Sequence, residues 1–140
     1  MKSKSIFIDT SFFKALIDQQ DDFYTQAQNI WEQLQQHNSQ LASSNYVLDE
    51  TATLIRAKIG LQTALKFRQT LINSRQIEIF RVMIDDEAQA WDWFKNDWSK
   101  LSFTDCVSFA QMKRLNISQV CSFDNHFKRA GFKMIKSSTF

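Results

Sequence analysis

The sequence predicts an α/β fold with one mostly parallel central sheet of about four or five strands flanked by helices. Short apolar runs, such as SIFI at residues 5–8, alternate along the chain with longer segments whose apolar residues recur at helical spacing. The 140 residues are 44% apolar, and with no proline and two glycines they contain no linker composition. We therefore expect one domain spanning residues 1–140, with right-handed crossovers between parallel strands.

The first half of the chain supplies strand and helix signals in turn. Apolar residues such as Phe12 and Ile30 lie on the inward stripes of two early helices. Ser43 or Ser44 is expected to cap the third helix, and Gly60 to end it. The expected elements are a strand at residues 5–8, helices at 10–17 and 23–36, a strand at 41–42, and helices at 45–59 and 61–71.

The second half repeats the alternation. Three acids open the expected helix at 85–96, as the helix dipole prefers, so these acids need no further explanation. Trp91, Phe94 and Trp98 recur at helical spacing and are expected in the core, with Trp93 off that stripe. The expected elements are a strand at residues 77–82, helices at 85–96 and 102–115, and strands at 120–123 and 132–135.

Composition restricts the class of protein. No segment approaches the roughly 18 apolar residues of a membrane span, and the first residues lead into a strand without the apolar core of a signal peptide. We expect a soluble, cytoplasmic protein that does not bind a membrane. Cys106 and Cys121 lack the spacing of a metal site and are expected to be buried free thiols.

Basic residues are distributed unevenly, although the formal net charge is only +2. No Lys or Arg lies between Lys14 and Arg56. The later basic residues are either ordinary solvated helix faces, which composition favours, or a surface for a phosphate backbone. They form two groups: Arg56, Lys58, Lys66 and Arg68, and then Lys113, Arg114, Lys128, Arg129, Lys133 and Lys136.

Two acids follow buried strands of the expected sheet. Asp9 comes directly after the first strand, and Asp124 directly after the strand at 120–123. A carboxylate in this position either caps the next helix or belongs to a site, because an unpaired buried charge is costly. The carboxyl ends of parallel strands share one edge of a sheet, where open α/β folds bind their ligands. We expect the two carboxylates to meet there.

Two further acids lie on helices. Glu50 is three residues after Val47 and is expected on the inward stripe of the helix at 45–59; an exposed rim position is an equal alternative. Asp105 begins an apolar line in the helix at 102–115. Ser102 and Asp105 also match a capping box, in which Asp105 bonds back to the Ser102 backbone, and this does not exclude a functional role.

Four carboxylates are thus expected at one edge: Asp9, Glu50, Asp105 and Asp124. At about 4 Å, each like-charged pair repels by roughly 4 kcal/mol at an effective dielectric constant of 20. They cannot all ionise without a cation. An all-oxygen ligand set without a His or Cys cluster is typical of Mg²⁺ or Mn²⁺.

Four segments carry a resemblance to a known family. They are FIDTSFF at residues 7–13, SNYVLDET at 44–51, LSFTDCVSFAQMKRLNI at 101–117 and VCSFDNHFKRAGF at 120–132. In their order and spacing they resemble PIN-domain ribonucleases of the kind that act as toxins in VapBC-type, type II toxin–antitoxin pairs. The resemblance covers nearly the whole chain and implies a single PIN-like domain.

The resemblance implies a Mg²⁺-dependent endoribonuclease that cleaves phosphodiester bonds in RNA. Asp9, Glu50, Asp105 and Asp124 match the family's catalytic, metal-binding acids, with Glu50 holding the metal or orienting water. Thr10 or Ser11 matches a hydroxyl beside the first acid, and Ser122 stands where the family commonly has Thr. The residues expected to orient carboxylates or touch substrate are Thr10, Ser11, Ser102, Thr104 and Ser122.

The remaining expectations concern RNA contacts, His126 and protein partners. Lys113, Arg114, Lys128 and Arg129 flank the expected site in sequence and are expected to contact the RNA backbone. His126, two residues after Asp124, is expected to be a surface-loop histidine, because a metal already activates the nucleophile. The resemblance also implies an antitoxin partner and a homodimer, with the helices at 23–36 and 61–71 offering apolar surface for either.

Three other functions stay open. The first is a non-catalytic PIN-like module that binds RNA or protein. The second is a solitary RNA-processing nuclease without an antitoxin. Retention of all four acids argues against the non-catalytic module. A phosphotransfer protein on a similar sheet is disfavoured, because Ser11 stands where a haloacid-dehalogenase-like phosphatase needs its second Asp and no acidic pair of the receiver type is present.

Overall fold

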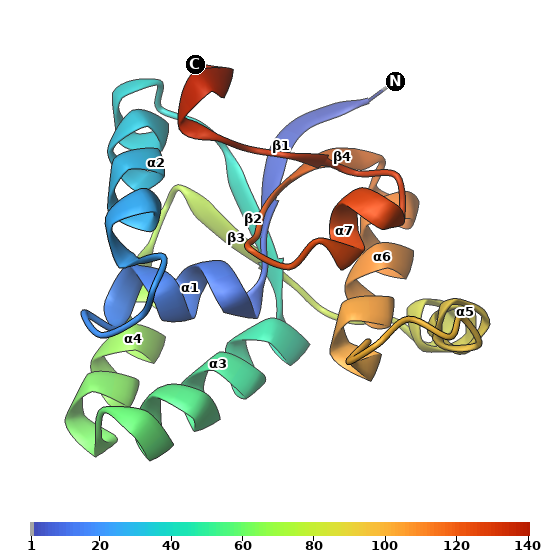
Figure 1. Ribbon diagram of the computed structural model, residues 1–140, viewed down its shortest axis with the longest axis horizontal. Coiled ribbons are helices and arrows are strands. Elements are labelled where there is room, and N and C mark those ends of the chain that lie inside the picture. Colours follow the sequence, from blue (N-terminus) through green and yellow to red (C-terminus); the bar gives the residue numbers. More distant parts are fainter. Residues whose placement is uncertain (1) are drawn as a thin grey trace.

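The computed structural model describes residues 2–140 as one five-stranded sheet between two groups of helices (Figure 1). The strand order is β3-β2-β1-β4-β5, and every neighbouring pair is parallel. The predicted α/β class with a parallel sheet is confirmed. The strands are β1 (Ser3–Ile8), β2 (Leu41–Ser44), β3 (Ile77–Phe80), β4 (Ile117–Cys121) and β5 (Lys133–Met134).

The helices divide between the two faces of the sheet. In Figure 1, α1 to α4 gather on one side and α5 to α7 on the other. Within residues 2–140, no helix is both long and apolar enough to cross a lipid bilayer. The helices are α1 (Thr10–Ile17), α2 (Tyr24–Gln36), α3 (Asn45–Lys58), α4 (Leu61–Asn73), α5 (Ile84–Phe94), α6 (Phe103–Leu115) and α7 (His126–Arg129), followed by the short 3₁₀ helix η1 (Ser137–Thr139).

The strand order creates a switch point beside β1. The chain runs from β1 through β2 to β3 on one side, and then crosses back to β4 and β5 on the other. Ile8 at the end of β1 pairs with Cys121 at the end of β4. Connections that leave two adjacent parallel strands in opposite directions open a crevice at their carboxyl ends. The residues that follow β1 and β4 therefore lie at the place where this fold class binds ligands.

The core holds this edge rigid. Phe7 and Ile8 in β1 are fully buried, as are Phe12 at the start of α1 and Phe109 in α6. The Phe109 ring packs edge-on against Phe127 of α7, with centroids 4.9 Å apart. Close packing of large side chains fixes the backbone positions from which the polar residues of the edge project. Cys106 and Cys121 are buried free thiols, as predicted.

β3 and β4 both end two residues earlier than predicted, because polar side chains bind the amides beyond their ends. β3 ends at Phe80 rather than at residue 82, where the Val82 amide instead donates to Asn45 Oδ1. β4 ends at Cys121 rather than at residue 123. Beyond it, the Phe123 amide donates to Ser11 Oγ, which removes it from any strand ladder. Asp124 thus lies in a loop and not directly at a strand end.

The prediction for the aromatic residues of α5 was wrong. Trp91 and Phe94 are 56% and 42% exposed, whereas Trp93, expected off the core stripe, packs against Phe109 at 5.2 Å between ring centroids. The helix ends at Phe94, so Trp98 lies beyond it, but Trp98 is partly buried and packs against the core, as predicted. Ala90 is the fully buried apolar residue of α5, because its small side chain allows close approach to α6.

Candidate active site

Asp9 begins the site at the junction of β1 and α1. Its side chain is 3% exposed, and its Oδ1 accepts a hydrogen bond of 3.0 Å from the Phe12 amide, so the residue caps α1. Ser11 Oγ donates to Oδ1 at 2.8 Å and Ser122 Oγ donates to Oδ2 at 2.6 Å. The two readings of Asp9, helix cap and site residue, are therefore compatible.

Ser122 connects the two strand ends. It donates to Asp9 and accepts from the Asp124 amide at 2.9 Å, while Ser11 Oγ accepts from the Phe123 amide at the same distance. These bonds tie the loop after β4 to the first turn of α1. The hydroxyl that takes the place of the family's usual Thr thus orients one acid and shapes the loop that carries another.

Asp105 and Asp124 meet across this edge. Ser102 caps α6 by accepting from the Asp105 amide at 3.0 Å, which is the Ser102 half of the predicted capping box, and this places the Asp105 carboxylate in the first turn. Asp105, Asp124 and His126 each offer one oxygen or nitrogen within 4.8 Å of the others. The Asp105 side chain is 16% exposed and that of Asp124 is 28% exposed. Both are accessible from solvent, as a substrate site requires.

The electrostatics of the cluster favour a bound cation. The pKa of Asp9 is raised to about 6. Burial is the main cause and the charge of Asp124 adds to it, while hydrogen bonds to the carboxylate act in the opposite direction. Burial, followed by the charge and hydrogen bonding of Asp124, raises the pKa of Asp105 to about 8. These carboxyl groups resist ionising together, which is the condition that a divalent cation relieves. The donors present fit such an ion.

Glu50 does not lie on the buried stripe that was expected. It is exposed, and α3 buries Val47, Thr51 and Ile55 instead. This stripe is narrow because α3 packs on α1 and α4 along one side. The exposed rim position, which the sequence left as the alternative, is the observed one.

The predicted hydroxyl residues have different surroundings. Thr10 Oγ1 is buried and makes no hydrogen bond within residues 2–140. Ser102 is committed to the α6 cap, and Thr104 follows it, half-buried, in the first turn of the helix. Ser11 and Ser122 donate to the Asp9 carboxylate, and a hydrogen bond with Ser102 lowers the pKa of Asp105.

His126 was expected on a surface loop, and this was wrong. It begins α7 with a side chain only 16% exposed, and its Nδ1 lies 2.9 Å from Asp124 Oδ1 and 3.7 Å from Asp105 Oδ2. Its ring stacks on Trp98, with centroids 6.0 Å apart. The sequence signal was its position two residues after Asp124. The contacts that bury it come from the distant 98–99 segment and carry no sequence signal.

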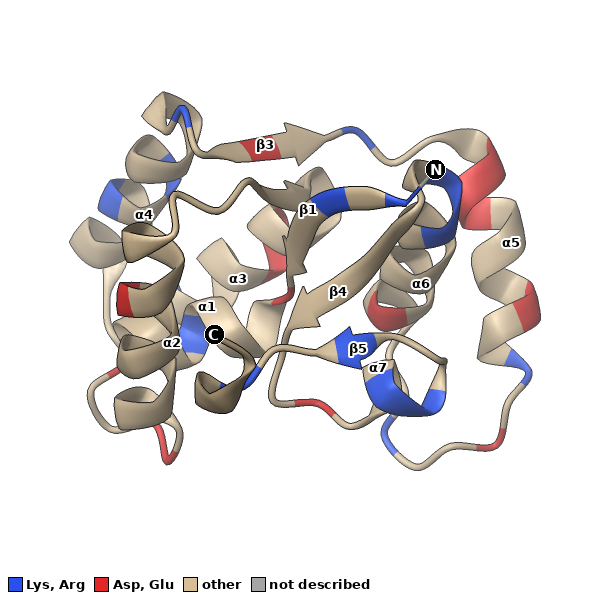
Figure 2. Cartoon of the chain, turned by 90° about the horizontal axis from the view of Figure 1, so that it is seen from above, with Lys and Arg blue, Asp and Glu red and all other residues tan. Residues whose placement is uncertain are grey.

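The basic residues separate into two locations. Figure 2 shows Lys and Arg on α7 and β5, next to the loop that carries Asp124. Arg129 lies over the Trp98 ring at 4.8 Å. Arg114, at the far end of α6 from Asp105, binds the buried Asp86 through Nε at 2.7 Å. Asp86 is thus an ion-pair residue of the core, and not simply a charge that suits the dipole of α5.

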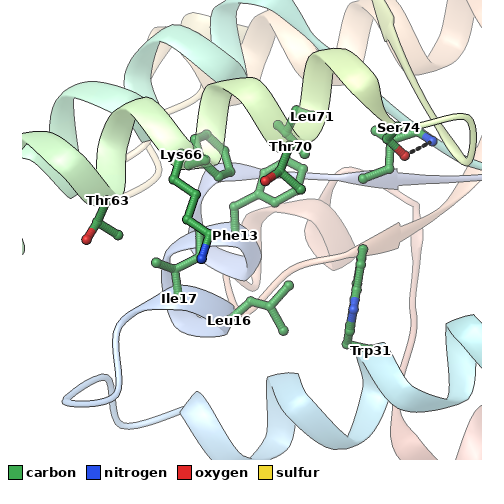
Figure 3. Close-up of a pocket in the computed structure, with 11 residues that line it drawn as sticks. Phe13, Leu16, Ile17, Trp31, Thr63, Lys66, Thr70, Leu71 and Ser74 are labelled. Atoms are coloured by element: carbon green, nitrogen blue, oxygen red, sulfur yellow. Dashed lines mark hydrogen bonds between the residues drawn. The ribbon is translucent and has the colours of Figure 1, made fainter.

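An apolar pocket of about 390 Å³ lies away from the acids, between α1, α2 and α4 (Figure 3). Phe13 and Leu16 of α1, Trp31 of α2 and Leu71 of α4 line it. In Figure 3, the Lys66 side chain extends from α4 toward Ile17 at the pocket edge. The pocket is suited to apolar side chains and has no acid to serve the cluster.

Comparison with known proteins agrees with the geometry. The model of the PIN domain family matches residues 6–133. This chain belongs to the PIN-domain family. Its sequence is 33% identical over 132 residues to the 23S rRNA-specific endonuclease VapC20 of two Mycobacterium tuberculosis strains, covering 94% of this chain and 98% of that protein. The predicted resemblance to VapC-type PIN ribonucleases is confirmed.

Two solved structures share the PIN fold. The structure of M. tuberculosis VapC20, described as a sarcin–ricin loop cleaving toxin, superposes with a TM-score of 0.84 at 32% identity, covering 94% of this chain and 98% of that one. VapBC-1 from nontypeable Haemophilus influenzae superposes with a TM-score of 0.67 at 11% identity, covering 96% and 98%, which supports the fold alone.

Proposed function

We propose that this PIN-domain protein is a divalent-cation-dependent endoribonuclease that uses Asp9, Asp105 and Asp124 as its metal-binding acids, with Mg²⁺ or Mn²⁺ as the ion. The observation that carries the proposal is the meeting of these carboxyl groups at the switch point of the sheet, with the pKa of Asp9 and of Asp105 raised. The similarity to a named 23S rRNA-specific endonuclease supports the same activity class.

The residues of the site have different roles. Asp105 and Asp124 would offer carboxylate oxygens to the cation, and hydrogen bonds from Ser11 and Ser122 fix the orientation of the Asp9 carboxylate. A bound divalent cation supplies Lewis-acid activation of water and offsets charge on the scissile phosphate. Glu50, exposed on α3, is assigned to the rim, where it orients water or holds the ion. Burial and Asp124 raise the pKa of Asp105 to about 8, so a bound cation would favour its ionised form.

RNA is the proposed substrate, bound through its backbone beside the acids. Lys128 and Arg129 on α7 lie next to the loop that carries Asp124, and they are the basic residues that we assign to phosphate contacts. Lys113 and Arg114 end α6, one helix length from Asp105, and Arg114 is occupied by Asp86. The protein is proposed to act in the cytoplasm, where ribosomal RNA is found.

An antitoxin is the proposed protein partner, and its docking site is the pocket in Figure 3. The pocket is lined mainly by apolar side chains, with Lys66 at its edge. A segment with two or three apolar side chains and one acid matches this surface. A homodimer through α4 stays a second proposal, and light scattering after gel filtration measures it. A monomer at every concentration contradicts it.

The experiment that tests the proposed substrate is end mapping on ribosomes. Purified protein is incubated with bacterial ribosomes, free 23S rRNA and a synthetic sarcin–ricin stem-loop, each with Mg²⁺ or Mn²⁺, and new ends are located by primer extension. We expect one dominant cut that Asp105→Asn abolishes. Cuts scattered over all RNAs leave a ribonuclease with a different target, and no cut in any RNA contradicts the proposal.

A further inference from the structure

One ring nitrogen of His126 is fixed by a partner outside the acids. Nε2 lies 2.9 Å from the carbonyl oxygen of Ser99. Because a carbonyl oxygen only accepts, Nε2 must carry the hydrogen. In the neutral imidazole, Nδ1 then has the free lone pair. Stacking on Trp98, at 21° between the ring planes, prevents the ring from turning out of this orientation.

The free nitrogen faces the acids. Nδ1 is buried, and it makes no aligned hydrogen bond within the part of the chain that the structure describes. Asp124 Oδ1 is 2.9 Å away and Asp105 Oδ2 is 3.7 Å away. The Nδ1 lone pair therefore lies close to the carboxylate oxygens without pointing directly at Asp124 Oδ1, and this arrangement is repulsive unless positive charge lies between these groups.

The 2.9 Å separation matches that of adjacent ligands on one ion, and the 3.7 Å separation lies between those of adjacent and opposite ligands. With bonds of about 2.1 Å, adjacent ligands of an octahedral ion lie about 3 Å apart, and opposite ones about 4.2 Å apart. The Asp124 carboxylate also accepts from the backbone amide of His126 at 2.9 Å, which fixes the two side chains relative to each other. A metal-binding His typically donates its other ring hydrogen to a backbone carbonyl, as His126 does to Ser99.

We propose that His126 Nδ1 is a direct ligand of the divalent cation held by Asp105 and Asp124, and that this nitrogen makes the site prefer Mn²⁺ to Mg²⁺. The inference rests on the proposed metal-dependent function and adds a ligand to it. Mg²⁺ favours oxygen ligands and retains its waters, whereas imidazole nitrogen strengthens binding of later divalent metals. The site is therefore a mixed nitrogen and oxygen site, and not the all-oxygen site that the sequence indicated.

Pulsed electron paramagnetic resonance of the Mn²⁺-loaded protein tests this without relying on activity. A coordinated imidazole gives a ¹⁴N coupling to the Mn²⁺ spin, and the chain has only two histidines. His37→Gln is the matched control. His126→Gln keeps a donor for the Ser99 carbonyl at the place of Nε2 but removes Nδ1. His126→Asn restores an oxygen ligand at the place of Nδ1.

We expect the ¹⁴N coupling in the wild type and in His37→Gln, and its loss in His126→Gln. The Kd for Mn²⁺ should rise at least about tenfold in His126→Gln, since losing even an outer partner of a metal site costs 10- to 100-fold. His126→Asn should recover part of that loss. The Kd for Mg²⁺ should change less than about threefold, because water replaces the lost ligand.

Two results overturn the inference differently. If wild-type protein binds Mn²⁺ in a manner that Asp105→Asn abolishes, but shows no ¹⁴N coupling, then His126 is not a ligand and the proposed function stands. If wild-type protein binds Mg²⁺ but not Mn²⁺, the inference fails and the proposed function stands; if it binds neither ion, both fail. The wild-type spectrum alone decides the point even if His126→Gln does not fold.

Discussion

Asp9 shows at the scale of one residue how the chain keeps a buried carboxyl group usable. Burial raises its pKa, hydrogen bonds from Ser122, the Phe12 amide and Ser11 oppose that rise, and the resulting pKa is about 6. Each of these donors also has a local structural role, since they cap α1 or close the loop after β4. The same contacts therefore fold the edge and hold Asp9 close to ionisation.

Replacing Ser122 is the direct test of this balance. In Ser122→Ala the pKa of Asp9 should rise above its value of about 6, because Ser122 makes the hydrogen bond that lowers it most. Ser122→Thr keeps the hydroxyl and should leave the pKa of Asp9 unchanged. The ¹³C chemical shift of the Asp9 carboxyl group, followed against pH in chelator, measures both. An Ala variant that titrates like the wild type contradicts the assigned role.

The sequence predicted part of this site, and the reason is local. Asp9 and Asp124 follow strands, and Asp105 follows a helix cap, so nearby residues determine where they point. His126 was missed as a cluster residue because its burial depends on Trp98 and Ser99, which are distant in sequence. Spacing left an inward and an exposed position of Glu50 as equal alternatives, and the packing of α3 on its neighbours leaves it exposed.

At the scale of elements, an ion pair fastens α5 to α6. Asp86 is 1% exposed. Its carboxylate accepts hydrogen bonds from Arg114 Nε at 2.7 Å, from Arg114 Nη2 at 2.9 Å and from the Met83 amide at 2.9 Å. The two guanidinium hydrogen bonds match the geometry of the carboxylate. The hydrogen bond from the Met83 amide caps the start of α5. The pair positions α5 beside the helix whose first turn carries Asp105.

Removing one partner should therefore be costly. Arg114→Met leaves the Asp86 carboxylate buried without its counter-charge. We expect the free energy of unfolding to fall by about 2–3 kcal/mol. This is less than the loss for a fully buried pair, because Arg114 itself is partly exposed. Urea denaturation measures it. Arg68→Met, an exposed residue of α4, is the control. A loss equal to that of the control contradicts the structural assignment of Arg114.

Helices were better predicted than strands. The range of α1 agrees residue for residue, and α2, α3 and α6 differ by one residue at an end, because amphipathic spacing and caps such as Ser44 are readable from sequence. The ends of β3 and β4 were not, because side chains from other elements, Asn45 and Ser11, take the amides that would have continued the ladder. Apolar character alone does not reveal that competition.

At the scale of the whole molecule, the acidic edge makes stability depend on pH. The pKa of Asp9 and that of Asp105 are raised in the folded state, to about 6 and about 8, from 3.8. Below about pH 4 both groups are protonated in the folded and in the unfolded chain, and their contribution to the free energy of unfolding is fully present. As pH rises through about 6 and 8, the unfolded chain ionises more readily, and stability is lost.

Urea midpoints in chelator should therefore fall between about pH 5 and about pH 8, and added Mn²⁺ should restore them at the upper end, because an ion that binds only the folded state stabilises it. Asp105→Asn removes one ionising group and should flatten the decline. Midpoints that rise over this range in wild-type protein, or a decline that Asp105→Asn leaves unchanged, contradict the account.

The most direct measurement of the central claim is cleavage of a labelled, structured RNA pool by purified protein in Mg²⁺, Mn²⁺ or EDTA. Asp9→Asn and Asp105→Asn, prepared identically, exclude a contaminating nuclease. We expect cutting that requires the cation and falls at least about 100-fold in both variants. Cutting that persists in EDTA or in the variants would contradict a metal-dependent nuclease built on this acidic edge.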